Sequence, residues 1–499
     1  MPARFLRRTA LVALFLAIIG MAGRAATAET VYLTEQKVID LALEKNLSVL
    51  VAGEDREIGR TGIQGAKSVY DTQLSLTADH LIDKRDQAIP VFGTDNRTTN
   101  WNLGLSRAFP TGTRADLNWT NQRNSTNSPF ATLNPYYEPA VEMALRQPVL
   151  KNTFGKQDRG GVALAKKRFE EIDFLARRRV MEAVYGVLSD YWAWVTHRGN
   201  ADVTETSVAE ARRLEALAAE KKIFGLYETT DVLAARANRM QMENQLTEAI
   251  RQRDDALGRL KRGLDFPDEE DARSSDAVPV SAGGGGREDA LASAMANRSD
   301  YAAARARVEA QKIEVSLARN RKWPQMDLVA SLRLNGVDTS YGSSLGEIGG
   351  GDHPAYFFGG EFAWPIENRL AKSESRRAEH EKKKALFELK DVENRVAQEV
   401  EERWREVQST RKQVANAREI ERVEREKWTL ELEKYRVGRS SSDLVIRYQE
   451  DYLEARRRAL ASLFQHRMAV LGLKLAEETL VERHRNGGAA RSSDSGGSP

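Results

Sequence analysis

The sequence contains no cysteine, only six histidines and only 13 prolines. The absence of cysteine excludes disulfide scaffolds, thiolate metal sites, cysteine nucleophiles, iron–sulfur clusters and a lipid anchor on an N-terminal cysteine. No two histidines lie three to five residues apart, so the short spacings of zinc sites are missing as well. With 41% hydrophobic and 30% charged residues, the chain is too apolar for wholesale disorder and too charged for a helical membrane protein.

Common enzyme motifs are missing too. The sequence has no G-x-x-x-x-G-K-[ST], no H-E-x-x-H and no convincing G-x-S-x-G elbow. The glycines at 283–286 are followed by Arg287 and Glu288, which is typical of a flexible linker rather than a phosphate-binding loop. We therefore expect no catalytic, cofactor-binding or metal-binding residues, and a protein that is not an enzyme.

Residues 1–28 have the three parts of a secretory signal peptide. Three arginines precede an apolar run from Leu11 to Met21, and an A-x-A-like cleavage site ends at Ala28. Removal of this segment takes away four arginines and changes the formal net charge from +3 to −1, so the composition indicates no nucleic-acid partner. No later stretch approaches 18 uncharged apolar residues, which leaves a periplasmic protein, a secreted protein or an outer-membrane β-structure.

The rest of the chain is organised as a duplication, in which a helix, a strand-like region and a long helical hairpin occur twice. The first opening helix is expected from Thr34 to about Lys67, and Trp192 and Trp404 occupy corresponding places in the two long hairpins. The expected boundaries are 1–28 for the signal peptide, 29–265 for the first repeat (strands about 71–150, helical hairpin 156–263), 266–286 for a linker or equatorial region, 287–482 for the second repeat (strands about 323–366, helical hairpin 370–482) and 483–499 for a disordered tail.

The second helix of each repeat is unusually long. Residues 370–436 contain neither proline nor glycine, and at 1.5 Å per residue such a helix reaches ~100 Å. Its apolar residues recur at steps of three or four, close to the 3.5-residue average of a left-handed coiled coil. A helix with a narrow apolar seam and charged flanks packs beside other helices, in a bundle or an α-helical tube.

Alternating apolar and polar residues mark the strand-like regions. The runs are about 7–11 residues long, which is the length of a tilted strand that crosses an outer membrane. They comprise 100–106, 114–120, 138–147, 325–335 and 356–364. Tryptophans and tyrosines in these runs suit interfacial aromatic belts. The alternative is a soluble β-domain between helices. If the strands cross a membrane, one chain has too few to close a barrel, so several chains must share one.

Two glycine turns, each at the end of a very long helix, complete the pattern. They are Phe224–Leu233 in the first repeat and Tyr435–Val445 in the second, with Gly225 and Gly438 as the turn glycines. With the duplicated order of helix, strand pair and long helical hairpin, these turns make the chain resemble the TolC family of outer-membrane efflux proteins. The resemblance covers nearly all of the expected mature chain, from Leu33 to about Leu475.

The resemblance implies a mainly α fold with β-strands, in which long coiled-coil-like helices form an α-helical barrel. It also implies a homotrimer whose strands combine into one 12-stranded transmembrane barrel in the outer-membrane lipid, while the helices extend into the periplasm. Proteins of this family dock onto a periplasmic adaptor and an inner-membrane pump in tripartite efflux or type I secretion systems. They are passive conduits, without cofactors, that are gated at their periplasmic tips.

The resemblance also implies a gate. A threonine–aspartate pair of the first turn meets a tyrosine and an arginine of the second in such proteins, and Thr230, Asp231, Tyr435 and Arg439 match them here. The second turn is one residue shorter than the family pattern, so Arg439 directly follows Gly438. An Asp–Arg pair with partial water access is a releasable latch. The alternative is an exposed turn with incidental charges.

Asp443 matches an aspartate that the family places toward the pore, where three copies make an acidic ring that attracts cations. A second aspartate of the family is replaced by Ile446, followed by Arg447, so the ring is less acidic. Alternatively, Asp443 is the N-cap of the last helix. For the whole chain, the competing reading is a soluble periplasmic coiled-coil adaptor or scaffold. The sequence names neither the cargo nor the pump.

Overall fold

The computed structural model describes residues 31–86, 91, 93–225, 227–266, 272–274, 276, 278–279, 285–351 and 353–481. The expected signal peptide, the expected tail and most of the expected linker lie outside the described residues. The chain divides into two compact units, each treated separately below. The hairpin unit comprises Met1–Ala52, Arg179–Asn297 and Ala397–Pro499, and the sheet unit comprises Gly53–Arg178 and Arg298–Val396.

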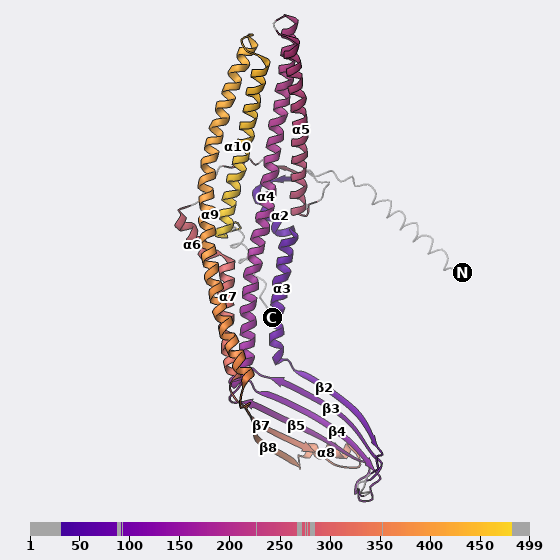
Figure 1. The fold of residues 1–499 in the computed structure, drawn as a ribbon. Helices are drawn as coiled ribbons and strands as arrows, with labels where there is room; N and C mark the ends of the chain where they lie inside the picture. Colours follow the sequence, from indigo (N-terminus) through magenta and orange to yellow (C-terminus); the bar gives the residue numbers. More distant parts are fainter. Residues whose placement is uncertain are drawn as a thin grey trace, which may run out of the picture. The chain divides into compact units, whose positions relative to one another are not determined.

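Two helical hairpins make up most of the hairpin unit (Figure 1). The first joins the later part of α4 (Lys156–Ile223) to α5 (Thr229–Gly263), and the second joins the later part of α9 (Arg369–Arg436) to α10 (Ser442–Glu477). The remaining elements are α2 (Glu35–Lys45), the start of α3 (Leu47–Lys67), α6 (Arg287–Asn297), and the short parallel pair of β1 (Val31–Leu33) and β6 (Ala272–Ser274).

The prediction of a single helix from Thr34 to about Lys67 is wrong, because the structure has two helices there, α2 and α3. Asn46 separates them with an extended backbone (φ −63°, ψ 124°). Its side-chain oxygen accepts a hydrogen bond from the backbone N–H of Ser48, and its side-chain nitrogen donates to the carbonyl of Gly263. An asparagine that can bond to local backbone groups in this way favours a helix break over a helix interior.

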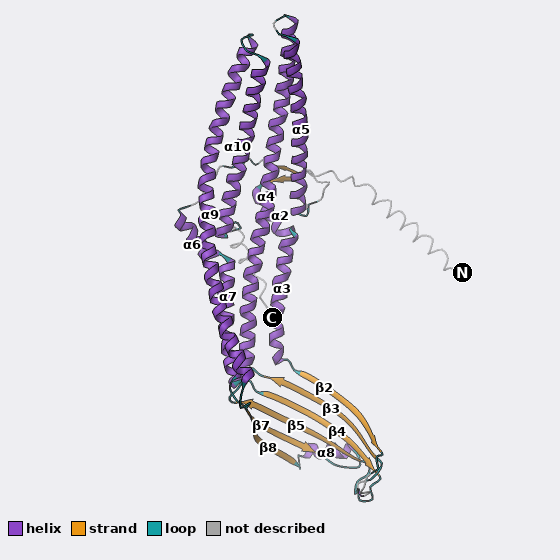
Figure 2. Ribbon diagram, in the orientation of Figure 1, coloured by secondary structure: helices purple, strands orange, loops and turns teal. Residues whose placement is uncertain are grey.

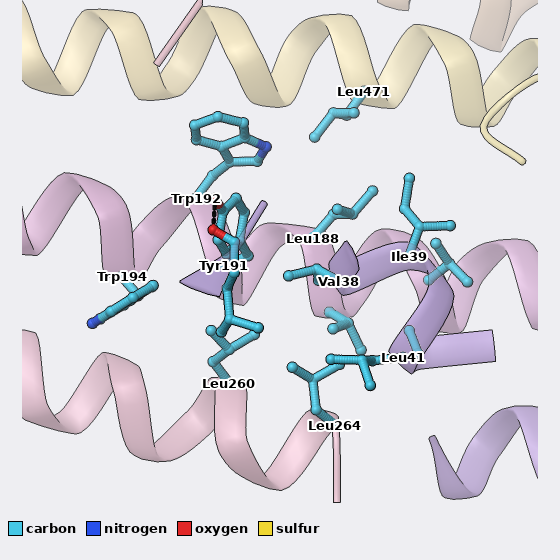
Figure 3. Close-up of a cluster of buried hydrophobic side chains, with 14 of the residues drawn as sticks. Val38, Ile39, Leu41, Leu188, Tyr191, Trp192, Trp194, Leu260, Leu264 and Leu471 are labelled. Atoms are coloured by element: carbon cyan, nitrogen blue, oxygen red, sulfur yellow. Dashed lines mark hydrogen bonds between the residues drawn. The ribbon is translucent and has the colours of Figure 1, made fainter. Parts of the chain in front are cut away.

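A cluster of large side chains forms the core of the hairpin unit between α2, α4, α5 and α10 (Figure 3). Tyr191 and Trp192 are fully buried there, with their rings edge to face at 5.1 Å. The Tyr191 hydroxyl donates to the Leu33 carbonyl and bonds to Ser274, so it ties both short strands to α4. The Trp192 indole N–H donates to Glu35, which also pairs with Arg467 of α10.

The sheet unit holds one antiparallel sheet of six strands within its described residues, in the order β2-β3-β4-β5-β7-β8 (Figure 2). Helix α7 (Ser299–Arg321) precedes β7, and the short helix α8 (Tyr341–Gly350) connects β7 to β8. The strands are β2 (Gln73–Asp83), β3 (Asn96–Ala108), β4 (Arg114–Thr126), β5 (Tyr136–Pro148), β7 (Gln325–Asn335) and β8 (Pro354–Ala363).

The two repeats contribute unequally to this sheet. β2 to β5 fall within the first strand-like region and β7 and β8 within the second. A 12-stranded barrel shared by three copies uses four strands from each chain, whereas the described residues of this chain supply six. The additional hairpin therefore lies in the first repeat, where the alternating segment is longer.

The strand register sorts apolar and polar side chains onto opposite faces of the sheet, because side chains alternate along each strand. One register row carries an apolar or aromatic residue on all six strands: Leu74, Leu105, Leu117, Met143, Leu332 and Tyr356. The adjacent row on the opposite face carries Ser75, Gly104, Asn118, Glu142, Arg333 and Ala355. We call these the apolar face and the polar face of the sheet.

Helix α8 packs on the apolar face, near the end of the sheet that lies away from the helices. The Tyr341 ring lies 5.9 Å from Trp101 and 5.8 Å from Tyr137, and its hydroxyl donates to the side-chain oxygen of Asn121. Asn121 is a polar residue within the apolar face, and it is buried with this hydrogen bond satisfied. None of the helices within the described residues is long and apolar enough to cross a membrane.

Candidate functional site

The candidate site lies at the tips of the two hairpins, where each long helix ends at a glycine. Gly225 and Gly438 have left-handed backbones, with φ of +70° and +77°. The Gly438 N–H donates to the Tyr435 carbonyl and the Arg439 N–H to the Lys434 carbonyl, so the last turn of α9 closes on itself. Both glycines have open space where a Cβ would stand, so the positive φ, not crowding, favours glycine here.

A pair of stacked tyrosines joins the two tips. The rings of Tyr227, which precedes α5, and Tyr435, at the end of α9, lie 4.8 Å apart with planes only 10° from parallel. The Tyr227 hydroxyl donates to the Tyr435 carbonyl at 2.6 Å, and the Tyr435 hydroxyl bonds to Ser442 at 2.9 Å. Tyr435 is fully buried. We call Tyr227 and Tyr435 the tyrosine clasp.

Burial of the clasp makes its phenols weaker acids than a free tyrosine. Desolvation, together with the neighbouring Tyr435 and the charge of Asp231, raises the pKa of Tyr227 to about 12. Desolvation also raises the pKa of Tyr435, opposed by the Ser442 hydrogen bond and supported by the charge of Asp231. Asp231 therefore lies close enough to both phenols to act on them electrostatically.

A buried carboxylate supports the second tip. Glu431 of α9 is 5% exposed, and one of its oxygens accepts a hydrogen bond from the Ser440 hydroxyl while the other pairs with Lys434. The Ser440 bond and then Lys434 lower the pKa of Glu431, so it stays ionised. This residue holds the turn from Tyr435 to Ser440 in its folded form.

Of the four expected gate residues, Tyr435 is part of the clasp and the other three lie in the two tip turns or the first turn of α5. The four side chains, all among the described residues, do not form one hydrogen-bonded network. Asp231 accepts a hydrogen bond from the backbone N–H of Glu228 at 3.0 Å, at the start of α5, and Thr230 is exposed beside it. Arg439 is exposed, and no bond between it and Asp231 occurs in the described part of the chain. A latch between Asp231 and Arg439 is therefore not formed within a single copy.

The placement of Asp443 corrects one reading of the sequence. The N-cap of α10 is Ser441, with an extended backbone (φ −99°, ψ 157°), so Asp443 lies one residue inside the helix and is not its cap. It is exposed in the first helical turn, where a carboxylate interacts favourably with the helix dipole. It is therefore open to solvent in a single copy.

Sequence reasoning missed Tyr227 and Glu431. Tyr227 stands among turn residues, and its partner is 208 residues away in the sequence, so no local pattern indicates the stack. Glu431 lies on a charged helix face that is indistinguishable by periodicity from the solvated glutamates around it. Within the described residues, no group of three or more histidine, aspartate or glutamate side chains is arranged to hold a metal ion.

Long paired hairpins, a duplicated arrangement and a sheet with one apolar face define the class of outer-membrane channels with an α-helical barrel and a β-barrel. Residues 290–483 match the family described as outer membrane efflux protein. The expected family and fold class, and with them the class of outer-membrane efflux channel, are thereby confirmed. No curated protein matches the chain.

Solved structures with this fold cover almost the whole chain. The CmeC outer membrane channel of Campylobacter jejuni is 16% identical, with a TM-score of 0.65, over 92% of this chain and 91% of its own. The MtrE outer membrane channel of Neisseria gonorrhoeae, in its open state, is 16% identical, with a TM-score of 0.67, over 89% of both chains. The outer membrane protein VceC of Vibrio cholerae is 14% identical, with a TM-score of 0.64, over 89% of this chain and 95% of its own.

Proposed function

We propose that this protein is the outer-membrane exit duct of a tripartite efflux or type I secretion system, and that it acts as a passive conduit without enzymatic activity. The observation that supports this most is the apolar face of the sheet. Leu74, Leu76 and Met143 on this face are 68%, 71% and 51% exposed in a single chain. Leaving so many apolar side chains in water is unfavourable, whereas lipid solvates them, and the polar face then lines an aqueous lumen.

The conduit is a homotrimer in this proposal. Two stripes of apolar residues at seven-residue spacing stay exposed on the hairpins: Leu233 and Met240 on α5, and Val423 and Leu430 on α9. A seven-residue repeat is the spacing of a left-handed coiled coil, so these stripes fit helices of neighbouring copies. The unpaired edges of β2 and β8 likewise need partners in lipid, where open strand edges are not tolerated.

The hairpin tips form the gate and the docking end of the conduit. Asp231 and Arg439 are available for contacts between copies, because each is at least partly exposed at its tip. An Asp–Arg pair across the copies closes the tip by a charge-assisted hydrogen bond and opens when a partner competes for it. A periplasmic adaptor binds near these tips, and an inner-membrane pump supplies the energy for transport.

Single-channel recording of the purified protein in planar bilayers tests the conduit and the gate together. We expect the wild type to conduct weakly, and Asp231→Ala and Arg439→Ala each to raise conductance several-fold by removing the latch. Asp254→Ala is the matched control, since Asp254 is an exposed aspartate of α5 outside the tip. If the purified protein forms no channel, the proposed conduit function is contradicted. If all three substitutions change conductance equally, the proposed gate is contradicted.

The competing function is that of a soluble periplasmic adaptor or scaffold. Cell fractionation distinguishes such a protein from the proposed outer-membrane duct. A soluble protein leaves the apolar face uncovered and is released from membranes by salt. The proposed duct stays in the outer-membrane fraction through a salt wash and migrates as a heat-modifiable trimer.

A further inference from the structure

The strand count departs from that of a 12-stranded trimeric barrel, and the departure has a geometric consequence. We infer that three copies of this chain close an 18-stranded barrel by pairing β8 of each copy with β2 of the next. This inference rests on the proposed homotrimeric conduit. It adds a specific interface between copies and a wider outer-membrane pore.

Strand direction permits this closure. Every neighbouring pair in the sheet is antiparallel, so the six strands alternate in direction from β2 to β8. β2 runs away from the helical part of the sheet unit and β8 returns toward it (Figure 1). β8 of one copy and β2 of the next are consequently antiparallel, and the ring has an even number of antiparallel strands, as in bacterial outer-membrane barrels.

The stagger of the sheet fits the same closure. The register row that begins at Gln73, the first residue of β2, reaches β8 at Phe357. β8 continues for six more residues, 358 to 363, to its helical end at Ala363. Six residues over six strands is one residue per strand, the stagger that gives a strand tilt of about 36° in closed barrels. The isolated sheet thus already has the slant that a closed membrane barrel requires.

Threefold symmetry fixes the pairing between copies. In the proposed ring the helical ends of β2 and β8 meet at the same membrane surface, which sets Ala363 opposite Gln73 of the next copy. Counting back along the antiparallel pair, Phe357 stands opposite Asp79 of that copy. All four of these residues are on the polar face, so the apolar face continues from one copy to the next without a register slip.

The width of the pore follows from the strand number. With strands about 4.8 Å apart and tilted by about 36°, 18 strands enclose a backbone cylinder roughly 34 Å across, against roughly 23 Å for 12 strands. A barrel of 16–18 strands leaves an aqueous channel. The polar face, with residues such as Asn118, Glu142 and Arg333, lines that channel.

Paired cysteines test the interface directly, because the chain has no cysteine of its own. We compare Phe357→Cys with Asp79→Cys against Phe357→Cys with Thr120→Cys, after oxidation in outer membranes. The second pair reports the alternative in which only β4, β5, β7 and β8 enter a 12-stranded barrel and β8 meets β4 of the next copy at the corresponding register. Phe357 and Asp79 are on opposite edge strands of one sheet, so a link between them forms only between copies.

We expect the Asp79 pair to give covalent dimers and trimers with no larger product, and the Thr120 pair and the single-cysteine variants to give none. End-on cryo-electron microscopy of the same trimers should show a ring close to the larger diameter. Links only in the Thr120 pair, or in neither pair of a membrane-inserted trimer, overturn the 18-stranded barrel while the trimeric conduit stands. If the largest cross-linked product is a dimer, the barrel contains 12 strands from two chains. That result overturns the homotrimer as well.

Discussion

At the scale of single residues, the tyrosine clasp connects the two repeats at their tips, beside a cluster of buried apolar side chains. Tyr227→Phe removes the 2.6 Å hydrogen bond to the Tyr435 carbonyl but keeps the stacked ring, and we expect it to cost about 1 kcal/mol of local stability. Tyr227→Ala removes the stack too, at roughly 2 kcal/mol or more. Hydrogen exchange at both tips should rise in that order.

Conductance measured on the same variants should follow the same order, since loosened tips close less completely. Tyr32→Ala is the matched control, because Tyr32 is 63% exposed and belongs to β1, far along the chain from either tip. Equal exchange at the tips in Tyr227→Ala and the wild type would show that the clasp does not hold the hairpins together.

The raised pKa of Tyr227, about 12, makes the clasp sensitive to alkali. An unfolded tyrosine ionises near pH 10, so between about pH 10 and 12 the closed clasp binds more protons than the open one. The closed form is therefore fully stabilised below pH 10 and loses that advantage as the pH rises to about 12. Ultraviolet titration should show fewer late-ionising phenols in Tyr227→Phe than in the wild type, and an unchanged number of late phenols would contradict the assignment.

The candidate residues that the sequence identified are those with a local signature. Gly225 and Gly438 follow from the turns, and the charge of Asp231 contributes to the raised pKa of Tyr435. The roles of Thr230, Arg439 and Asp443 stay predictions, because they depend on contacts with other copies. Tyr227 escaped detection for the opposite reason, since its role is set by a contact across 208 residues of chain.

At the scale of helices, the exposed stripes predict how the copies assemble. Leu430→Glu places a charge in the stripe on α9, where an interface between copies would have to bury it, so the trimer should dissociate at a markedly lower temperature. Thr429→Glu is the matched control, since Thr429 is the exposed neighbour of Leu430 outside the stripe. Semi-native electrophoresis over a temperature series measures both; identical melting of the two variants would contradict packing along this stripe.

At the scale of strands, the alternating pattern identified where strands occur but not how many share the sheet. The segments at 100–106 and 325–335 lie inside β3 and β7, because alternation is a property of the strand itself. The pairing of β5 with β7 joins segments far apart in the chain, and alternation does not indicate which strands become neighbours. The break at Asn46 was missed because the apolar periodicity continues through it, while the side-chain bond to Gly263 that stabilises it comes from α5.

At the scale of the whole molecule, a duplicated pattern of helices and strands specifies this fold, although this chain and the solved channels share few identical residues. The family match spans residues 290–483, whereas the solved channels share the fold over 89–92% of the chain at 14–16% identity. Seam spacing in the helices and alternation in the strands constrain residue types, not particular residues. The first repeat carries the additional strands, and this is the part outside the family match.

In the proposed duct, the sheet of one chain is completed only in a membrane and only by identical copies. The most direct measurement is the mass of the protein extracted by detergent from salt-washed outer membranes, determined by native mass spectrometry. We expect a trimer that is absent from the soluble fraction. A monomer that appears in the soluble fraction after a salt wash, with no protein left in the membrane, would contradict it.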